Sequence, residues 1–402
     1  MPTINTKWFT SAMAGAPAIN GNIGGGLIGM LTACLKDGFN LLTLDSLVVA
    51  GNVATGTKNG HGFIVNQVVL IAGATPAGLN GEWRVTSVTA NTVMFDTTGI
   101  SDQTATGTIS IKAAPCGWLV PFTGTNLAVF KSGDATSTQL PVQIDDTTAQ
   151  YSTIRGAENF TDISTEVNHY ATQYMKRSNA TDANARPWLI VADSKGVYVG
   201  IQWTNSGVYD FYHFGDFSSV VAGDGYCFRL QALLTSAPAT IGEQSSVSDC
   251  NSSLCVAYGM FARAFTQISG GVASWQGSAA SMGYGAPMQA WNWLLSGQHG
   301  YTTTPNAGPY AAPAVTDNGY HFCPVFCVEN SAGGYQNIRG TARGLLHCLE
   351  YIPQANGYSI LSGVENVAGG LVLMARSAGY VRTGLSSYMS AASTLAFTLG
   401  DW

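Results

Sequence analysis

Three glycines, Gly24, Gly26 and Gly29, form the pattern G-x-G-x-x-G, the spacing of a loop that holds the phosphates of a dinucleotide. Such a loop follows a buried strand in a β-α-β unit, and an acidic residue comes about 20 residues later. The preceding segment, TKWFTSAMAGAPAIN, has no apolar run typical of a parallel strand. The following acid, Asp45, leads into a segment with an antiparallel pattern. The glycines therefore predict no nucleotide cofactor; they indicate a flexible segment before a helix, where the backbone packs closely against a neighbour.

The histidines, serines and cysteines also lack the spacing that catalysis or metal binding requires. The six histidines include no H-E-x-x-H or H-x-x-x-H pair, and no G-x-S-x-G sequence marks a nucleophilic serine. His61, in GHGF, is predicted to be a turn residue. The eight cysteines contain no C-x-x-C pair, and we expect them to be buried free thiols. Carboxylates are available for glycoside hydrolysis, but nothing in the sequence selects two of them. We predict no catalytic residue, no metal site and no cofactor.

One short amphipathic helix is predicted over residues 27–37. Lys36 lies in its last turn, and Gly38 can adopt the left-handed conformation that ends a helix. Residues at helical spacing form its apolar face: Ile23, Leu27, Met30, Leu31, Cys34 and Leu35. Because segments that pack closely against a partner use small residues, we predict that the start of this helix is a docking element. The predicted docking residues are Gly24, Gly25, Gly26, Leu27, Met30 and Leu31.

The rest of the chain has the short, alternating pattern of antiparallel β-strands. Between Thr43 and Ala113, turn residues separate apolar runs, which include Val68–Ile71, Trp83–Val88 and Val93–Phe95. Five or so short strands at this spacing predict a small β-barrel or sandwich. From residue 114 onward the pattern stays β-like, except that GAPMQAWNWLLSG indicates a helical turn or two.

The composition excludes several classes of protein. Charged residues make up 10% of the 402-residue chain, whereas about 25% is usual in soluble domains. The net charge is −6, and no cluster of lysine and arginine forms the basic stripe that nucleic-acid binding needs. Neither a signal peptide nor a transmembrane helix is predicted, so we expect folding in a cytoplasm. A surface rich in Gly, Ser, Thr and Asn suits a protein that lies against other copies of itself.

The segment HGFIVNQVVLIAGATPAGLNGEWRVTSVTANTVMFD resembles small β-modules that are common in tailed-bacteriophage virion proteins. This resemblance extends from about Val48 to Ile111. Flanking segments look like landmarks of a wider tail- or baseplate-associated structural family: GGLIGMLTACLKDGFN, GWLVPFTGTNLAVFKS, ARPWLIVADSKGVYV, YHFGDFSSVVAGDGY, IRGTARGLLHCLEY and LAFTLGDW. The region from Ser236 to Asp317 departs most from the family pattern.

The predicted fold class is mainly β, with antiparallel sandwich or barrel domains, a short N-terminal amphipathic helix and few other helices. If the helix and GWLVPF belong to one core, the β-module is an insertion, and its two ends lie close together. Four regions are predicted: 1–43 with helix 27–37 in the core domain, 44–113 as an inserted β-barrel or sandwich, 114–236 as a β-rich core domain, and 237–402 as a β-rich C-terminal region packed with the core.

The resemblance implies a structural virion component of the tail, baseplate or collar, assembled in the host cytoplasm. Its expected partners are copies of itself, in a ring or trimer, and other virion proteins. No nucleic-acid partner and no membrane insertion are expected. Three alternatives remain: a head-decoration protein, a receptor-binding fibre or spike module that recognises a host surface glycan or protein, and a glycan-degrading enzyme. The enzyme requires two carboxylates about 5–9.5 Å apart in a groove.

Overall fold

The computed structural model describes residues 4–233, 258–261, 275–280, 322–330, 336–348, 357–365, 367–382, 388–400 and 402. Within these residues the chain is mainly β: its sheets are antiparallel, and its helices are few and short. The predicted fold class is therefore confirmed. The helical turn expected at GAPMQAWNWLLSG lies outside the described residues.

A seven-stranded sheet forms the middle layer of the protein. Its strands, in spatial order, are β1 (Lys7–Thr10), β15 (Trp188–Ala192), β16 (Gly196–Ile201), β17 (Asp210–Asp216), β19 (Phe228–Gln231), β20 (Tyr258–Phe261) and β21 (Trp275–Ala280). Every residue of the first five strands in this order is buried. Because successive side chains point to opposite faces, complete burial means that both faces of this part of the sheet are covered.

A five-stranded sheet covers one face of the middle layer. Its strands are β10 (Trp118–Gly124), β11 (Leu127–Ser132), β12 (Val142–Asp145), β13 (Tyr151–Phe160) and β14 (Glu166–Lys176). The Trp118 ring meets the Phe214 ring edge-on, with centroids 5.5 Å apart. The backbone N–H of Lys176 donates a hydrogen bond to the hydroxyl of Tyr212 at 3.1 Å. These contacts join the two sheets into a sandwich.

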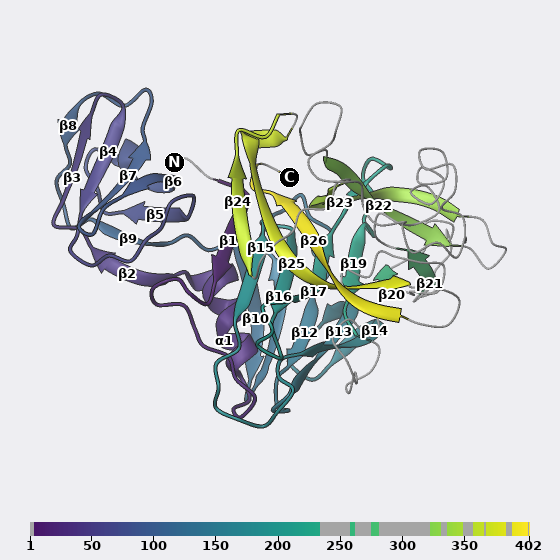
Figure 1. Ribbon diagram of the computed structural model, residues 1–402. Coiled ribbons are helices and arrows are strands. Elements are labelled where there is room, and N and C mark those ends of the chain that lie inside the picture. Colours follow the sequence, from purple (N-terminus) through teal and green to yellow (C-terminus); the bar gives the residue numbers. More distant parts are fainter. Residues whose placement is uncertain are drawn as a thin grey trace.

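A six-stranded sheet covers the opposite face, and its strands closest to the C-terminus, drawn in yellow-green and yellow, cross in front of the middle layer in Figure 1. The Phe397 ring lies 5.1 Å from that of Tyr198 and 5.3 Å from that of Phe211, measured between centroids. The strands are β18 (Ser218–Ser219), β22 (Phe322–Asn330), β23 (Gln336–Cys348), β24 (Tyr358–Ser362), β25 (Leu371–Arg382) and β26 (Tyr388–Thr398), with a 3₁₀ turn, η3 (Ala368–Gly370), before β25. The described parts of the core therefore form three β layers.

The N-terminal helix occupies the predicted span but changes geometry within it. An α-helix, α1 (Gly26–Thr32), continues directly into a π-helical turn, η1 (Ala33–Asp37). Gly38 follows with φ 74°, and its N–H donates to the carbonyl of Ala33 at 2.8 Å. This i to i−5 bond is the π-type bond, and Gly38 ends the helix as predicted; its ψ of 173°, however, is extended and differs from the left-handed helical conformation expected there.

A separate eight-stranded unit lies beside the three layers, at the left of Figure 1. Its own buried core includes Leu47, Val85 and Phe95. In chain order, the first strand of the unit (Phe39–Thr43) pairs with its last strand (Ser110–Ala113), and Thr43 lies opposite Ser110. The chain therefore enters and leaves the unit at neighbouring positions. An inserted module requires this geometry. The strands, in spatial order, are β2 (Phe39–Thr43), β9 (Ser110–Ala113), β5 (Val68–Ala72), β6 (Gly81–Val88), β7 (Thr92–Asp96), β4 (Val53–Thr57), β3 (Ser46–Ala50) and β8 (Gln103–Thr104), with a 3₁₀ turn, η2 (Ala77–Leu79), before β6.

Candidate functional site

The glycine segment before α1 packs against its own chain. The N–H of Gly25 donates to the backbone carbonyl of Asp146 at 3.0 Å, and Gly25 adopts φ 84°. A Cβ atom on Gly24 would lie 2.7 Å from the same carbonyl oxygen. Glycine is therefore needed here because the backbone approaches the turn after β12 too closely for a side chain.

The apolar face of α1 fills the protein's own core. Leu27, Met30 and Leu31 are completely buried, whereas the three glycines Gly24, Gly25 and Gly26 are half-buried. The three apolar side chains predicted as docking residues are thus inside the chain and present no surface to a partner. Periodicity identified the apolar face correctly from Leu27 onward, but Ile23, which was also assigned to this face, precedes the helix and is 64% exposed. Periodicity also does not reveal whether the surface that covers the face comes from the same chain or another.

A buried ion pair holds the start of this helix in place. The carboxylate of Asp146 accepts a hydrogen bond from the N–H of Leu27 at 2.8 Å, and its Oδ1 lies 3.2 Å from Nε of Arg177. Both charged side chains are fully buried, and Arg177 also donates to the carbonyl of Ile23 at 2.8 Å. Burial raises the pKa of Asp146, and Arg177 partly offsets that effect. This cluster positions the backbone at the start of the helix.

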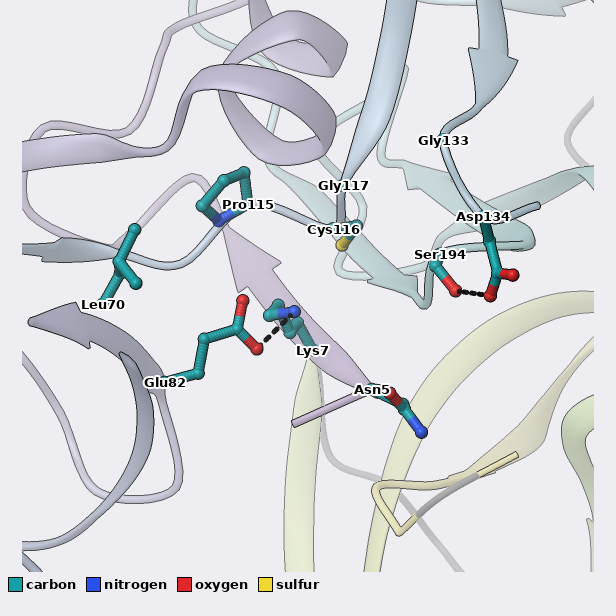
Figure 2. A pocket seen from close by; sticks show the side chains of 10 residues that line it. All are labelled: Asn5, Lys7, Leu70, Glu82, Pro115, Cys116, Gly117, Gly133, Asp134 and Ser194. Atoms are coloured by element: carbon teal, nitrogen blue, oxygen red, sulfur yellow. Dashed lines mark hydrogen bonds and ion pairs between the residues drawn. The ribbon is translucent and has the colours of Figure 1, made fainter. Parts of the chain in front are cut away.

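A pocket lies where the inserted unit meets the N-terminal strand (Figure 2). Its volume is about 370 Å³. Nζ of Lys7, on β1, lies 3.0 Å from Oε2 of Glu82, on β6, and both side chains are largely buried. On the other side, Ser194 donates to the carboxylate of Asp134 at 2.8 Å. The lining residues are Asn5, Lys7, Leu70, Glu82, Pro115, Cys116, Gly117, Gly133, Asp134 and Ser194.

The electrostatics of the pocket residues define the state in which each one is held. Burial raises the pKa of Cys116 to about 12, so its sulfur is a neutral thiol at physiological pH. Burial also disfavours the charge of Asp134, but hydrogen bonds from Thr136 and Ser194 outweigh it and lower the pKa of this carboxyl. Lys7 and Glu82 neutralise each other. The pocket therefore holds an ionised carboxylate, which accepts a hydrogen bond from the hydroxyl of Ser194, and a protonated thiol, which is a poor nucleophile.

Two histidines in the described residues, His61 and His213, have structural roles. Nε2 of His61 donates towards the carbonyls of Thr89 and Thr92, 3.0 Å from each, while Nδ1 accepts from the N–H of Phe63. His213 is buried in β17, and burial together with Arg229 holds its pKa well below the usual range. A neutral, enclosed imidazole adds packing rather than a titrating group at physiological pH.

Acidic side chains considered for glycoside hydrolysis are engaged elsewhere in the described parts of the structure. Asp216 accepts from the N–H and the hydroxyl of Thr138, at 2.8 and 2.5 Å. Asp193 caps the turn before β16 and pairs with Arg343, and Asp224 pairs with Arg339 at 3.1 Å. No cluster of His, Cys, Asp and Glu suited to a metal occurs among the residues that the structure describes.

No model of a known protein family matches the sequence, and no curated protein matches it either. Within the described parts of the chain, no helix is long and apolar enough to span a membrane.

Proposed function

We propose that this chain is a structural component of a tailed-phage virion, in the tail, baseplate or collar region. It acts by assembling with copies of itself and with neighbouring virion proteins. The observation that carries this proposal is a surface with exposed aliphatic side chains in a chain with 10% charged residues. Four such side chains, in separate segments of the chain, are each more than half exposed: Ile23, Leu41, Leu119 and Val220.

Assembly fits the physical character of this surface. The buried centre of a protein interface is poor in charged residues, so a low-charge surface loses little solvation when it is covered. Stable contacts need about 1,000 Å² or more of buried area. A ring uses one heterologous contact repeated around an axis, which allows two different faces of the same chain to be covered. The resemblance of the inserted module to virion modules supports the same role.

Two measurements test the proposal. The first locates the protein in intact particles by electron cryo-microscopy, and the second measures the mass of the purified full chain by light scattering. We expect density in the tail, baseplate or collar and a discrete homo-oligomer. Density on the capsid would instead identify a head-decoration protein, and density at a distal tip with binding to a host glycan or surface protein would identify a receptor-binding module. A monomer that releases oligosaccharide from host polysaccharide would overturn the proposal.

Surface substitutions identify the contacts. Lysine is introduced singly at Leu41, Leu119 and Val220, and Ser101→Lys adds the same charge at an exposed polar position. At least one of the three aliphatic variants should shift the oligomer towards monomer, because a buried unpaired ammonium is costly. Ser101→Lys should leave the oligomer intact. Unchanged assembly in all three aliphatic variants would show that these side chains lie outside the contacts.

A further inference from the structure

A single side chain of the inserted unit contacts both ends of the described chain. Arg84, on β6, donates from Nη1 to the carbonyl of Asn66 at 3.1 Å. Its Nη2 donates to the carbonyl of Thr6 at 3.2 Å and to that of Leu399 at 2.8 Å. Asn66 belongs to the inserted unit, Thr6 directly precedes β1, and Leu399 directly follows β26. One guanidinium therefore bonds to three segments that are far apart in sequence.

Neighbouring contacts join the same three segments. The hydroxyl of Thr6 donates to the carbonyl of Gly400 at 2.5 Å, which links the two ends of the chain directly. Glu82, two residues before Arg84, accepts from the N–H of Ile4 at 2.8 Å and pairs with Lys7. Figure 2 shows Glu82 reaching from the inserted unit towards Lys7. The N-terminal segment is thus held by the unit through charged groups on one strand.

The strand held in this way closes an edge of the middle sheet. β1 contains four residues and pairs only with β15, with Trp8 opposite Val191. Such a short edge strand has few ladder hydrogen bonds of its own, and segments of this kind open by local unfolding. Contacts outside the ladder therefore determine how often the edge opens. Nε1 of Trp8, on β1, donates to the carbonyl of Asn66 at 3.0 Å. This carbonyl therefore accepts hydrogen bonds from both Arg84 and β1.

We infer that Arg84 is a latch: it couples the inserted unit to β1 and to the segment after β26, so that both segments open together when it is removed. Arginine suits this position because its planar, multi-donor guanidinium bonds several carbonyls at once. A lysine at position 84 keeps the charge but presents a single ammonium. The latch makes the position of the unit and the closure of the sheet edge interdependent, whatever the protein assembles with.

Hydrogen exchange of the full chain, read by mass spectrometry, tests the latch in Arg84→Ala, Arg84→Lys and a control, Arg155→Ala. Arg155 lies on β13, is substantially exposed and is 3.9 Å from Glu166. In Arg84→Ala we expect amides of residues 7–10 and 399–400 to exchange about ten- to a hundredfold faster, because hydrogen bonds from a charged donor are lost. Arg84→Lys should accelerate amide exchange by a smaller factor, which should be the same in both segments. Arg155→Ala should leave exchange in both segments unchanged.

The pattern of exchange decides the outcome. Faster exchange in both chain ends, with the amides of Val93 and Phe95 in the unit unchanged, supports the latch. Acceleration of only one end, or of neither, overturns it. Equal acceleration throughout the unit also overturns it, because Arg84 would then only stabilise the unit itself. If Arg84→Ala does not fold, the comparison of Arg84→Lys with Arg155→Ala decides by the same criteria.

Discussion

Replacing Leu31 by alanine distinguishes a helix that belongs to the core from a helix that docks on a partner. Leu31 is 0% exposed and lies in the main hydrophobic cluster. Leu→Ala substitutions in a packed core cost about 2.7–5.0 kcal/mol, through lost burial and the cavity that remains. Alanine is the best helix former, so the substitution does not weaken the helix itself. Since folded proteins are stable by about 5–15 kcal/mol, the expected loss is a large fraction of the total.

The assay is equilibrium unfolding in urea, followed by tryptophan fluorescence, with Ile23→Ala as the matched control. Ile23 precedes the same helix but is 64% exposed, so its substitution should cost less than about 0.5 kcal/mol. We expect a lower midpoint for Leu31→Ala with an unchanged slope, which marks a loss of stability without a change in the unfolded state. A cost below about 1 kcal/mol together with weaker assembly would refute the reasoning, because the apolar face of α1 would then lie against a partner.

Three further predictions concern charged and ionisable groups. Glu82→Gln should cost about 1–3 kcal/mol in urea unfolding, because it leaves the largely buried ammonium of Lys7 without its counter-charge; no loss would show that the pair contributes nothing. Hydrogen bonds from Ser164 and Thr165 lower the pKa of Asp162 to about 2, so its stabilising contribution is present above the ordinary value of 3.8 and is lost as the pH falls towards 2. Asp162→Asn should therefore reduce stability at pH 6 and have little effect near pH 2; an equal effect at both would contradict this. Burial raises the pKa of Cys34 and Cys116, so neither should react with a thiol reagent at pH 8 until the protein unfolds, as read by mass spectrometry of labelled peptides.

Several strands of the inserted unit could be predicted from sequence because their apolar runs are bounded by turn residues. The apolar runs Val68–Ile71, Trp83–Val88 and Val93–Phe95 fall within β5, β6 and β7. In β7 the buried residues alternate with less buried ones, which is the period-two pattern that sequence reasoning detects. The expectation that the two ends of the insertion lie close together rested on the requirement that an insertion leaves the core where it enters. The pairing of β2 with β9 has this geometry, although β2 itself was expected in the core domain.

The middle layer was harder to predict because its strands have no polar face. In β15, β16 and β17 every residue is buried, so apolar residues occur on both faces and alternation cannot reveal which sheet covers each one. The arginines that join distant segments were equally hard to find from the sequence. Arg84 and Arg177 look like ordinary surface residues in the sequence, but their partners lie far away along the chain, as with Arg84 and Leu399.

By itself, the sequence determined the helix at the N-terminus, several strands of the inserted unit and the β character of the chain. Periodicity is a local property, since each side chain's direction follows from the backbone geometry of its own element. Only the tertiary structure decided what covers each face. The protein's own core covers Leu31, one further sheet lies on each side of β16, and the guanidinium of Arg84 bonds to both ends of the described chain. Those contacts join residues distant in sequence, so no local pattern records them.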